Sequence, residues 1–174
     1  NHFDQDFHRG LEAARDAGVN LAFIGANACF RKIRMEPNAA GEDRLLAAAG
    51  PVLARLRDIT GESAQLWRRQ GEHRVCVAAA ERPTGLRDTI PVGSQLTMRA
   101  GSAAQVLLAW EDPERMHRGL QNAAFSATAL SGIRRRGWAQ SVGERGQGVA
   151  SVSAPVRSPG GKIIAAVSVS GPLE

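Results

Sequence analysis

The sequence predicts an α+β fold, with a central antiparallel sheet flanked by helices. Three observations predict it. The 174 residues suit one globular domain, or one domain plus an appendage. The expected order of elements in the main domain is a helix, a hairpin, a turn-rich connection, further helices and a terminal antiparallel hairpin. The chain is 43% hydrophobic and 22% charged, with no apolar run of the roughly 18 residues that a membrane helix needs.

The first 37 residues form a separate segment in this interpretation. The spacing of apolar residues predicts a helix over Asp4–Ala17, and a short apolar run predicts a strand over Val19–Ile24. Pro37 disfavours helix at the residue before it and indicates a boundary. We therefore expect an N-terminal extension of unclear origin at residues 1–37 and the main domain at residues 38–174.

A second helix is predicted from Ala40 to Thr60, followed by Gly61 as its terminator. Proline suits the first turn of a helix, so Gly50-Pro51 is expected to restart it. Its apolar stripe consists of Leu45, Ala49, Val52, Leu56 and Ile59.

The next segments predict a hairpin and a turn-rich connection. Ala64–Arg69 and His73–Ala80 are rich in strand-forming residues, and the loop between them, residues 70–72, contains a glycine. Residues 84–96 carry two glycines and a proline, which indicates turns.

Three helices are then predicted. Ser102–Trp110 is strongly apolar and is expected to be buried, and Asp112-Pro113-Glu114 has the order of a helix start. Ser126–Arg136 forms the third, with Gly137 as its C-terminal cap. Its closing run of three arginines offsets the negative end of the helix dipole, which we prefer to a phosphate-binding stripe.

The last third predicts strands at Trp138–Ser141, Val149–Arg157 and Lys162–Ser170. The last two are joined by the turn sequence Ser158–Gly161. Alternate residues of a strand share a face, so this hairpin places Val149, Ser151 and Ser153 beside Ser168 and Ser170.

A face lined by hydroxyl groups has two interpretations. If the face is buried, each hydroxyl needs a partner, and a bound polar molecule can supply one. Alternatively, the serines face solvent or bond to neighbouring backbone. Ser102 also has two interpretations. It begins a helix whose free N–H groups can bind an anion, or its side chain serves only as the N-cap of that helix.

Signals for catalysis are poor. The four histidines form no HExxH motif and no compact metal spacing, and no GxSxG is present. Gly143–Gly148 is glycine-rich but opens no helix, so we expect a loop near a pocket rim and not a nucleotide site. Cys29 and Cys76 are expected to be small buried thiols in a reducing compartment. We expect no enzyme activity, catalytic residue, metal or cofactor.

Charge and the N-terminal residues add two expectations. A formal net charge of +5 bears on association and not on fold or reaction. Residues 1–6 are polar and acidic and lack the features of a secretory signal, so the expected location is cytoplasmic.

Several blocks of the main domain resemble the effector-binding domain of the IclR-type (isocitrate lyase regulator) transcription factors. Their order and spacing agree with the family over most of Ala39–Leu173. The blocks are Asp58–Glu62, Val92-Gly93, Gly101–Ala109 (GSAAQVLLA), Arg136–Trp138, Gly148-Val149, Ala154–Val156 and Ala165–Pro172.

The resemblance implies a GAF-like, profilin-like domain that binds a small organic acid or aromatic metabolite and acts as a homodimer or tetramer. DNA would be bound only through a winged helix-turn-helix that the family places N-terminal to this domain and that this chain lacks; no membrane partner is implied. The ligand pocket implied by the resemblance comprises Leu96, Ser102, Ala103, Ser141, Val149, Ser151, Ser168 and Ser170.

The chain departs from the family pattern at the pocket. Ser141 and Ser151 stand where well-known members carry an acidic residue and a cysteine, and Ala104-Gln105 replaces the usual Gly-Lys. The identity of the ligand is therefore not carried over.

Two other hypotheses remain open. Residues 17–27 resemble a short part of the large subunit of N,N-dimethylformamidase-type amidohydrolases, which suggests a fragment of such an enzyme. The third hypothesis is a dimerisation scaffold that binds no ligand.

Overall fold

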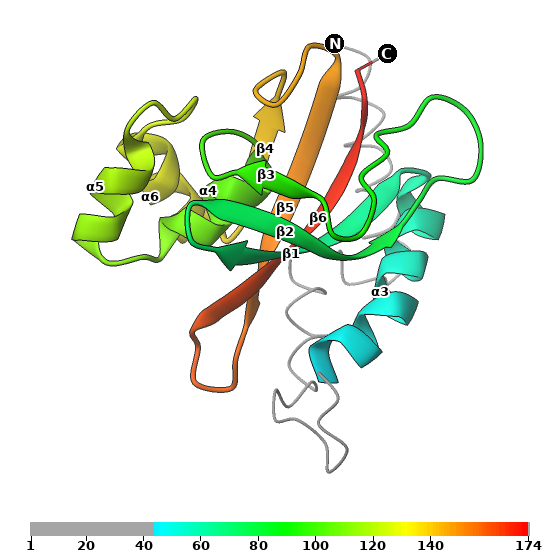
Figure 1. Cartoon of the computed structure of the whole chain (residues 1–174), viewed down its shortest axis with the longest axis horizontal. Coiled ribbons are helices and arrows are strands. Elements are labelled where there is room, and N and C mark those ends of the chain that lie inside the picture. The colour runs from blue at the N-terminus through cyan, green and yellow to red at the C-terminus, as the bar shows by residue number, and fades with distance from the viewer. Residues whose placement is uncertain (1–43, 174) are drawn as a thin grey trace.

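A six-stranded antiparallel sheet organises residues 44–173, the part of the chain that the computed structural model describes (Figure 1). The strand order is β3-β2-β1-β6-β5-β4, and the predicted α+β class with a central antiparallel sheet is confirmed. The helix and strand predicted before Pro37 lie outside the described residues. The elements are α3 (Arg44–Thr60), β1 (Ser63–Gln70), β2 (His73–Ala80), β3 (Gln95–Thr97), α4 (Ser102–Ala109), α5 (Pro113–Leu120), α6 (Ala127–Arg136), β4 (Ala139–Val142), β5 (Val149–Arg157) and β6 (Ile163–Pro172).

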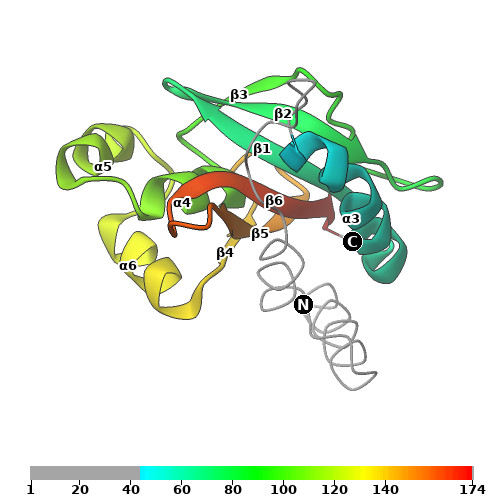
Figure 2. The ribbon, with the colours of Figure 1, turned by 90° about the horizontal axis from the view of Figure 1, so that it is seen from below.

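The two faces of the sheet pack against different helices. Leu66 and Trp67 are neighbours on β1 and therefore point to opposite faces. Leu66 belongs to an apolar cluster with residues of α3, whereas Trp67 belongs to a second cluster with residues of α4 and α6. Figure 2 shows α3 on its own and α4, α5 and α6 grouped together. The α4 face carries the serines of β5 and β6.

Helix α3 departs from the prediction in two ways. It runs without a break through Pro51, so the predicted restart is wrong; this proline is exposed, and packing on the opposite side of the helix outweighs the backbone hydrogen bond that proline cannot make. The stripe also differs from the prediction: Leu53 is 1% exposed and belongs to it, whereas Ile59 is 39% exposed. The predicted end is confirmed, because the amide of Gly61 donates to the carbonyl of Arg57.

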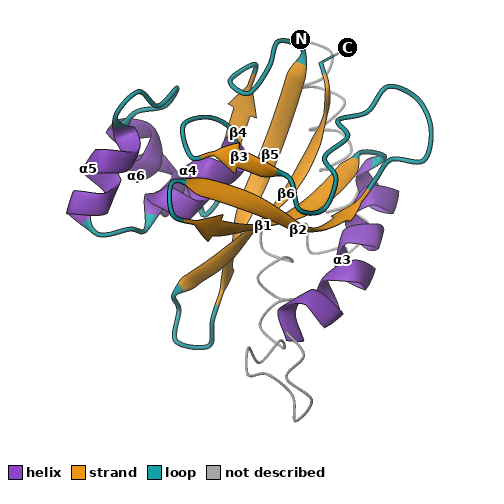
Figure 3. Ribbon diagram, in the orientation of Figure 1, coloured by secondary structure: helices purple, strands orange, loops and turns teal. Residues whose placement is uncertain are grey.

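The sheet consists of three hairpins, β1–β2, β4–β5 and β5–β6, and one unpredicted edge strand, β3 (Figure 3). The β1–β2 and β5–β6 hairpins are both confirmed, and β5 has the predicted bounds. The edge strand β3 is three residues long and pairs with the first residues of β2. It begins in the segment predicted to be turn-rich, residues 84–96, and ends at Thr97. So short a strand is stabilised by its partner and not by its own sequence pattern.

The three remaining helices begin and end close to the predicted positions. Asp112 caps α5 by accepting from the amide of Arg115, and Ser126 caps α6 by accepting from the amide of Ala129. Gly137 ends α6 in the left-handed conformation. All eight residues of α4 are buried. No helix in the described range is long and apolar enough to cross a membrane.

Candidate ligand-binding site

The serines of the C-terminal hairpin lie side by side on the sheet face that α4 covers. The register pairs Ser151 with Ser170, and Ser153 with Ser168. Ser141 of β4 extends the first pair, because it stands opposite Ser151. The alternation predicted from the sequence is therefore present, and Ser153, Ser168 and Ser170 are almost fully buried.

Four serine hydroxyl groups form one hydrogen-bonded chain. The Oγ of Ser102 donates to that of Ser151 at 2.7 Å, and a second bond of 2.7 Å joins Ser102 to Ser153. Ser153 and Ser168 are joined at 2.6 Å. Each hydroxyl has one proton, so Ser168 must donate to Ser153 and Ser153 to Ser102. The proton of Ser151, at the end of the chain, is left to donate to another group.

The start of α4 explains why Ser102 can join this chain. The N-cap is Gly101 and not Ser102, so the N-cap alternative for Ser102 is wrong and its hydroxyl is free to reach the sheet. Gly101 has a φ of 93°, which L side chains rarely adopt, and a Cβ there would lie 3.0 Å from the guanidinium of Arg74. Glycine is therefore required at this position.

A buried arginine lies beside these serines. Arg74 is 2% exposed, its guanidinium lies 5.1 Å from the centroid of the Trp67 ring, and it donates to the carbonyl of Thr97. Its buried Nε has no hydrogen-bond partner within residues 44–173. The pKa of Arg74 is lowered to about 10. Burial is the main cause and the positive charge of Arg145 adds to it, whereas the negative charge of Glu144 acts in the opposite direction. The side chain still carries its charge at neutral pH.

The loop between β4 and β5 covers the start of α4. The carboxylate of Glu144 accepts from the amide of Gly101 at 2.9 Å and from the side-chain amide of Gln105 at 2.9 and 3.1 Å. The next residue, Arg145, forms an ion pair with Asp88 from the loop after β2. Two loops far apart in sequence therefore meet over the serines.

The space enclosed by these groups is small. Its volume is about 10 Å³. One water molecule needs roughly 10–15 Å³, so the space is about the size of a single water. We call this space the serine hollow. It is lined by Gln65, Trp67, Arg74, Ile90, Gly101, Ser102, Ala103, Arg145, Ser151, Ser168 and Ser170.

The predicted pocket residues divide into two groups. Five line the serine hollow: Ser102, Ala103, Ser151, Ser168 and Ser170. Three do not. Ser141 is buried next to Ser151, Leu96 stands opposite Arg74 on the edge strand, and Val149 is half-buried opposite Pro172.

Sequence reasoning missed the charged residues of the hollow. Arg74 alternates with Cys76 on β2, and a charged residue at an inward-facing strand position was the available signal. Glu144 and Arg145 lie in the glycine-rich loop expected near a pocket rim, but no pattern indicated what they contact. Asp88 carried no sequence signal.

Cys76 behaves as a small buried side chain. Its thiol is free and fully buried on the same face as Trp67, as predicted, whereas Cys29 lies outside the described residues. Burial raises the pKa of the Cys76 thiol to about 11, an effect that a hydrogen bond with the backbone of Ala78 reduces. The thiol is therefore protonated and unreactive at neutral pH.

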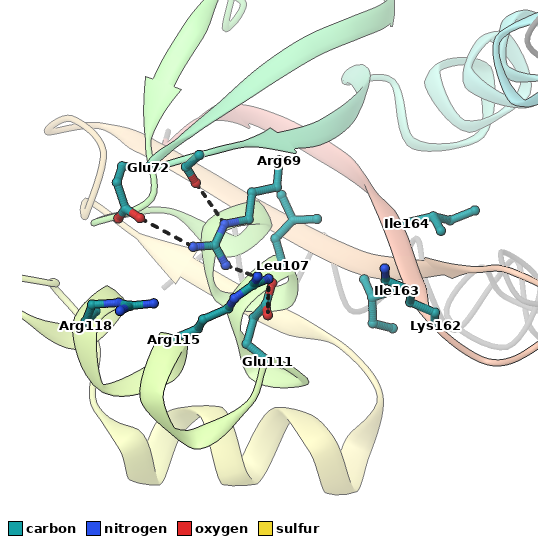
Figure 4. A pocket seen from close by; sticks show the side chains of 10 residues that line it. Arg69, Glu72, Leu107, Glu111, Arg115, Arg118, Lys162, Ile163 and Ile164 are labelled. Atoms are coloured by element: carbon teal, nitrogen blue, oxygen red, sulfur yellow. Dashed lines mark hydrogen bonds and ion pairs between the residues drawn. The ribbon is translucent and has the colours of Figure 1, made fainter.

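A larger groove of about 630 Å³ lies on the surface (Figure 4). It contains none of the predicted pocket residues. The side chain of Arg69 is paired with Glu111 at 2.9 Å and with Glu72 at 3.8 Å, and Arg115 also lies 3.6 Å from Glu111. The groove is lined by more cationic than anionic side chains. We nevertheless favour the smaller serine hollow as the candidate site, because five of the predicted pocket residues line it.

Comparison with known proteins identifies the class of protein. The family model described as the C-terminal part of the bacterial transcriptional regulator IclR matches residues 38–174. The HTH-type transcriptional regulator BhcR of Paracoccus denitrificans is 31% identical over 141 residues, which cover 74% of this chain and 50% of the relative. The chain thus spans about half the length of this relative.

Solved structures show the same fold. A structure assigned to the IclR regulators, from Silicibacter sp. TM1040, has a TM-score of 0.69 and 23% identity, and the match covers 74% of this chain and 56% of that one. The inducer-binding domain of the transcription factor PobR from Acinetobacter, a double mutant in complex with 3-hydroxybenzoic acid, has a TM-score of 0.64 and 21% identity, with 74% and 83% covered.

These matches define a domain of bacterial transcriptional regulators. The chain belongs to the IclR family.

Proposed function

We propose that this chain is the effector-sensing domain of an IclR-family regulator and that a small organic acid or aromatic metabolite binds in the serine hollow. The observation that carries the proposal is the chain of hydrogen-bonded serine hydroxyl groups beneath α4. At its end, the hydroxyl proton of Ser151 is left to donate to a group outside the chain. The 3-hydroxybenzoic acid complex of the PobR inducer-binding domain, which has the same fold, supports this ligand class.

The proposed mechanism is a population shift. The metabolite favours one arrangement of a homodimer or tetramer and thereby changes DNA binding by the winged helix-turn-helix of the regulator. A ligand can shift such an equilibrium only by its difference in affinity for the two arrangements. No catalytic residue is assigned, and the segment that suggested an amidohydrolase lies outside the described residues.

One observation favours a second candidate function. The hollow has a volume of about 10 Å³, which suits a dimerisation scaffold without a ligand. The two candidates differ in whether a metabolite stabilises the protein.

A thermal-shift screen of the full chain with small carboxylic acids and aromatic acids separates them. A ligand at 100 times its Kd stabilises the folded state by about 2.7 kcal/mol, which raises Tm by several degrees. We expect at least one acid to raise Tm in a concentration-dependent way. Ser151→Leu places a bulky side chain in the hollow and should abolish this shift, whereas Ser131→Leu on α6 should retain it. A flat screen would support the scaffold, whereas equal shifts for both variants would place the ligand outside the serine hollow.

A further inference from the structure

The serine hollow offers hydrogen-bond donors that have no acceptor. The other three hydroxyl protons form the hydrogen bonds that link the four serines, so the hydroxyl proton of Ser151 takes no part in the chain. The Nε–H of Arg74 is buried and unpartnered within the described range. Ser151 is half-buried, whereas a buried group left unsatisfied, such as the Nε–H of Arg74, costs roughly 1–3 kcal/mol, and more when it is charged. Both residues line the same hollow, so an acceptor for either donor would lie there.

The acceptor position at the start of α4 is taken by a residue of the chain itself. The first N–H groups of a helix lack intrahelical partners and favour an anion. The N-cap residue of α4 provides no side-chain hydrogen bond. Glu144 supplies the anion instead, by accepting from the amide of Gly101 and from the side chain of Gln105.

The charges around the hollow balance only while Glu144 is in place. Arg74 and Arg145 are positive, whereas Asp88 and Glu144 are negative, and Arg145 is paired with Asp88. Withdrawal of Glu144 would leave the buried charge of Arg74 without compensation. An uncompensated buried charge is costly, so whatever replaces Glu144 has to be an anion.

We propose that Arg74 is the charge anchor for an anionic group of the effector, and that Glu144 holds the place of that group while the protein is ligand-free. This inference rests on the proposed function, because it assigns the recognition of charge within the same hollow.

The exchange also explains how so small a space admits a ligand. The carboxylate of the effector takes the donors that Glu144 releases, and withdrawal of the Glu144 side chain opens space next to Gly101, which lines the hollow. A carboxylic acid is then preferred over its uncharged amide, because only the acid restores the charge balance beside Arg74.

The test compares acids with amides of the same shape. The full chain is titrated by calorimetry with acetate, lactate, benzoate and 3-hydroxybenzoate, and with the four corresponding amides. We expect acids to bind at least roughly tenfold more tightly than their amides. Arg74→Gln should remove this preference, and Arg74→Lys should retain part of it. Glu144→Gln should tighten acid binding by roughly tenfold, because a neutral side chain competes less well for the donors.

Two matched variants test where the charge effect arises. Glu114→Gln removes a carboxylate that is 82% exposed on α5, and Lys162→Gln removes a cation from the surface groove. Both should bind every compound as the parent does. If Arg74→Gln does not fold, the comparison of Glu144→Gln with Glu114→Gln still tests the inference, because Glu144 lies in a loop.

Hydrogen exchange gives a readout that does not depend on affinity. Glu144→Ala should speed exchange of the Gly101 amide, and the acid that binds most tightly should slow it again.

Equal binding of acids and amides, or Arg74 and Glu144 variants that bind like the parent, would overturn this inference. If Ser151→Leu still abolished binding in that case, the proposed function would stand. Failure of all eight compounds to bind the parent and Glu144→Gln would overturn both.

Discussion

Ser153 is the residue through which the candidate site is held together. It is fully buried, and its hydroxyl both accepts from Ser168 and donates to Ser102, which links β6 to the start of α4. One small polar side chain thereby joins the sheet to the helix that covers it.

Ser153→Ala is predicted to destabilise the protein by about 1–2 kcal/mol. The change removes both hydrogen bonds and leaves a buried donor on Ser168 without its acceptor. Urea unfolding followed by circular dichroism measures the difference. An unchanged unfolding midpoint would show that these hydroxyl groups find other partners.

Cys76 is predicted to make stability fall at alkaline pH. The thiol has its ordinary pKa of 9.0 in the unfolded chain and about 11 in the folded protein. The raised pKa means that its contribution to stability is complete below pH 9 and is lost as the pH rises through 11. Unfolding curves of the parent and Cys76→Ala between pH 8 and 11 should show a steeper decline for the parent. Parallel declines would place this thiol in contact with water.

At the scale of elements, the predictions hold where a segment's own pattern decides its structure. The bounds of β5 agree with the prediction because its alternation and flanking turns are local signals. Helix caps at Asp112, Ser126 and Gly137 are local for the same reason. β3 could not be predicted, because its structure depends on pairing with β2. The continuity of α3 through Pro51 likewise depends on packing against the sheet.

Pro51→Ala is predicted to stabilise α3 by about 2 kcal/mol. Alanine restores a backbone donor in the helix interior, and the gain exceeds the entropy that the unfolded chain recovers. Position 51 is exposed, so no packing is lost. Thermal unfolding should show a higher Tm, whereas Arg55→Ala on the same helix should change Tm little. A lower Tm for Pro51→Ala would indicate that the proline fixes a bend that the packing needs.

At the scale of the whole molecule, the sequence located one wall of the site but not its charges. The serines were predictable because alternation along a strand assigns them to one face. Arg74, Asp88 and Glu144 were not, because their meeting depends on how two loops fold over α4. The sequence pattern also does not predict that the hollow has a volume of only about 10 Å³. These missing parts are the ones that decide which ligand can enter.

The central claim is that an effector binds beneath the start of α4, between the two serine strands. Nuclear magnetic resonance of the nitrogen-15-labelled chain, titrated with the acid that raises Tm most, tests it directly. We expect the largest saturable shifts at the amides of Ser102, Ser151 and Ser168. Shifts confined to Arg69, Leu107 and Ile163 would place the ligand in the surface groove and contradict the account, as would the absence of saturable shifts.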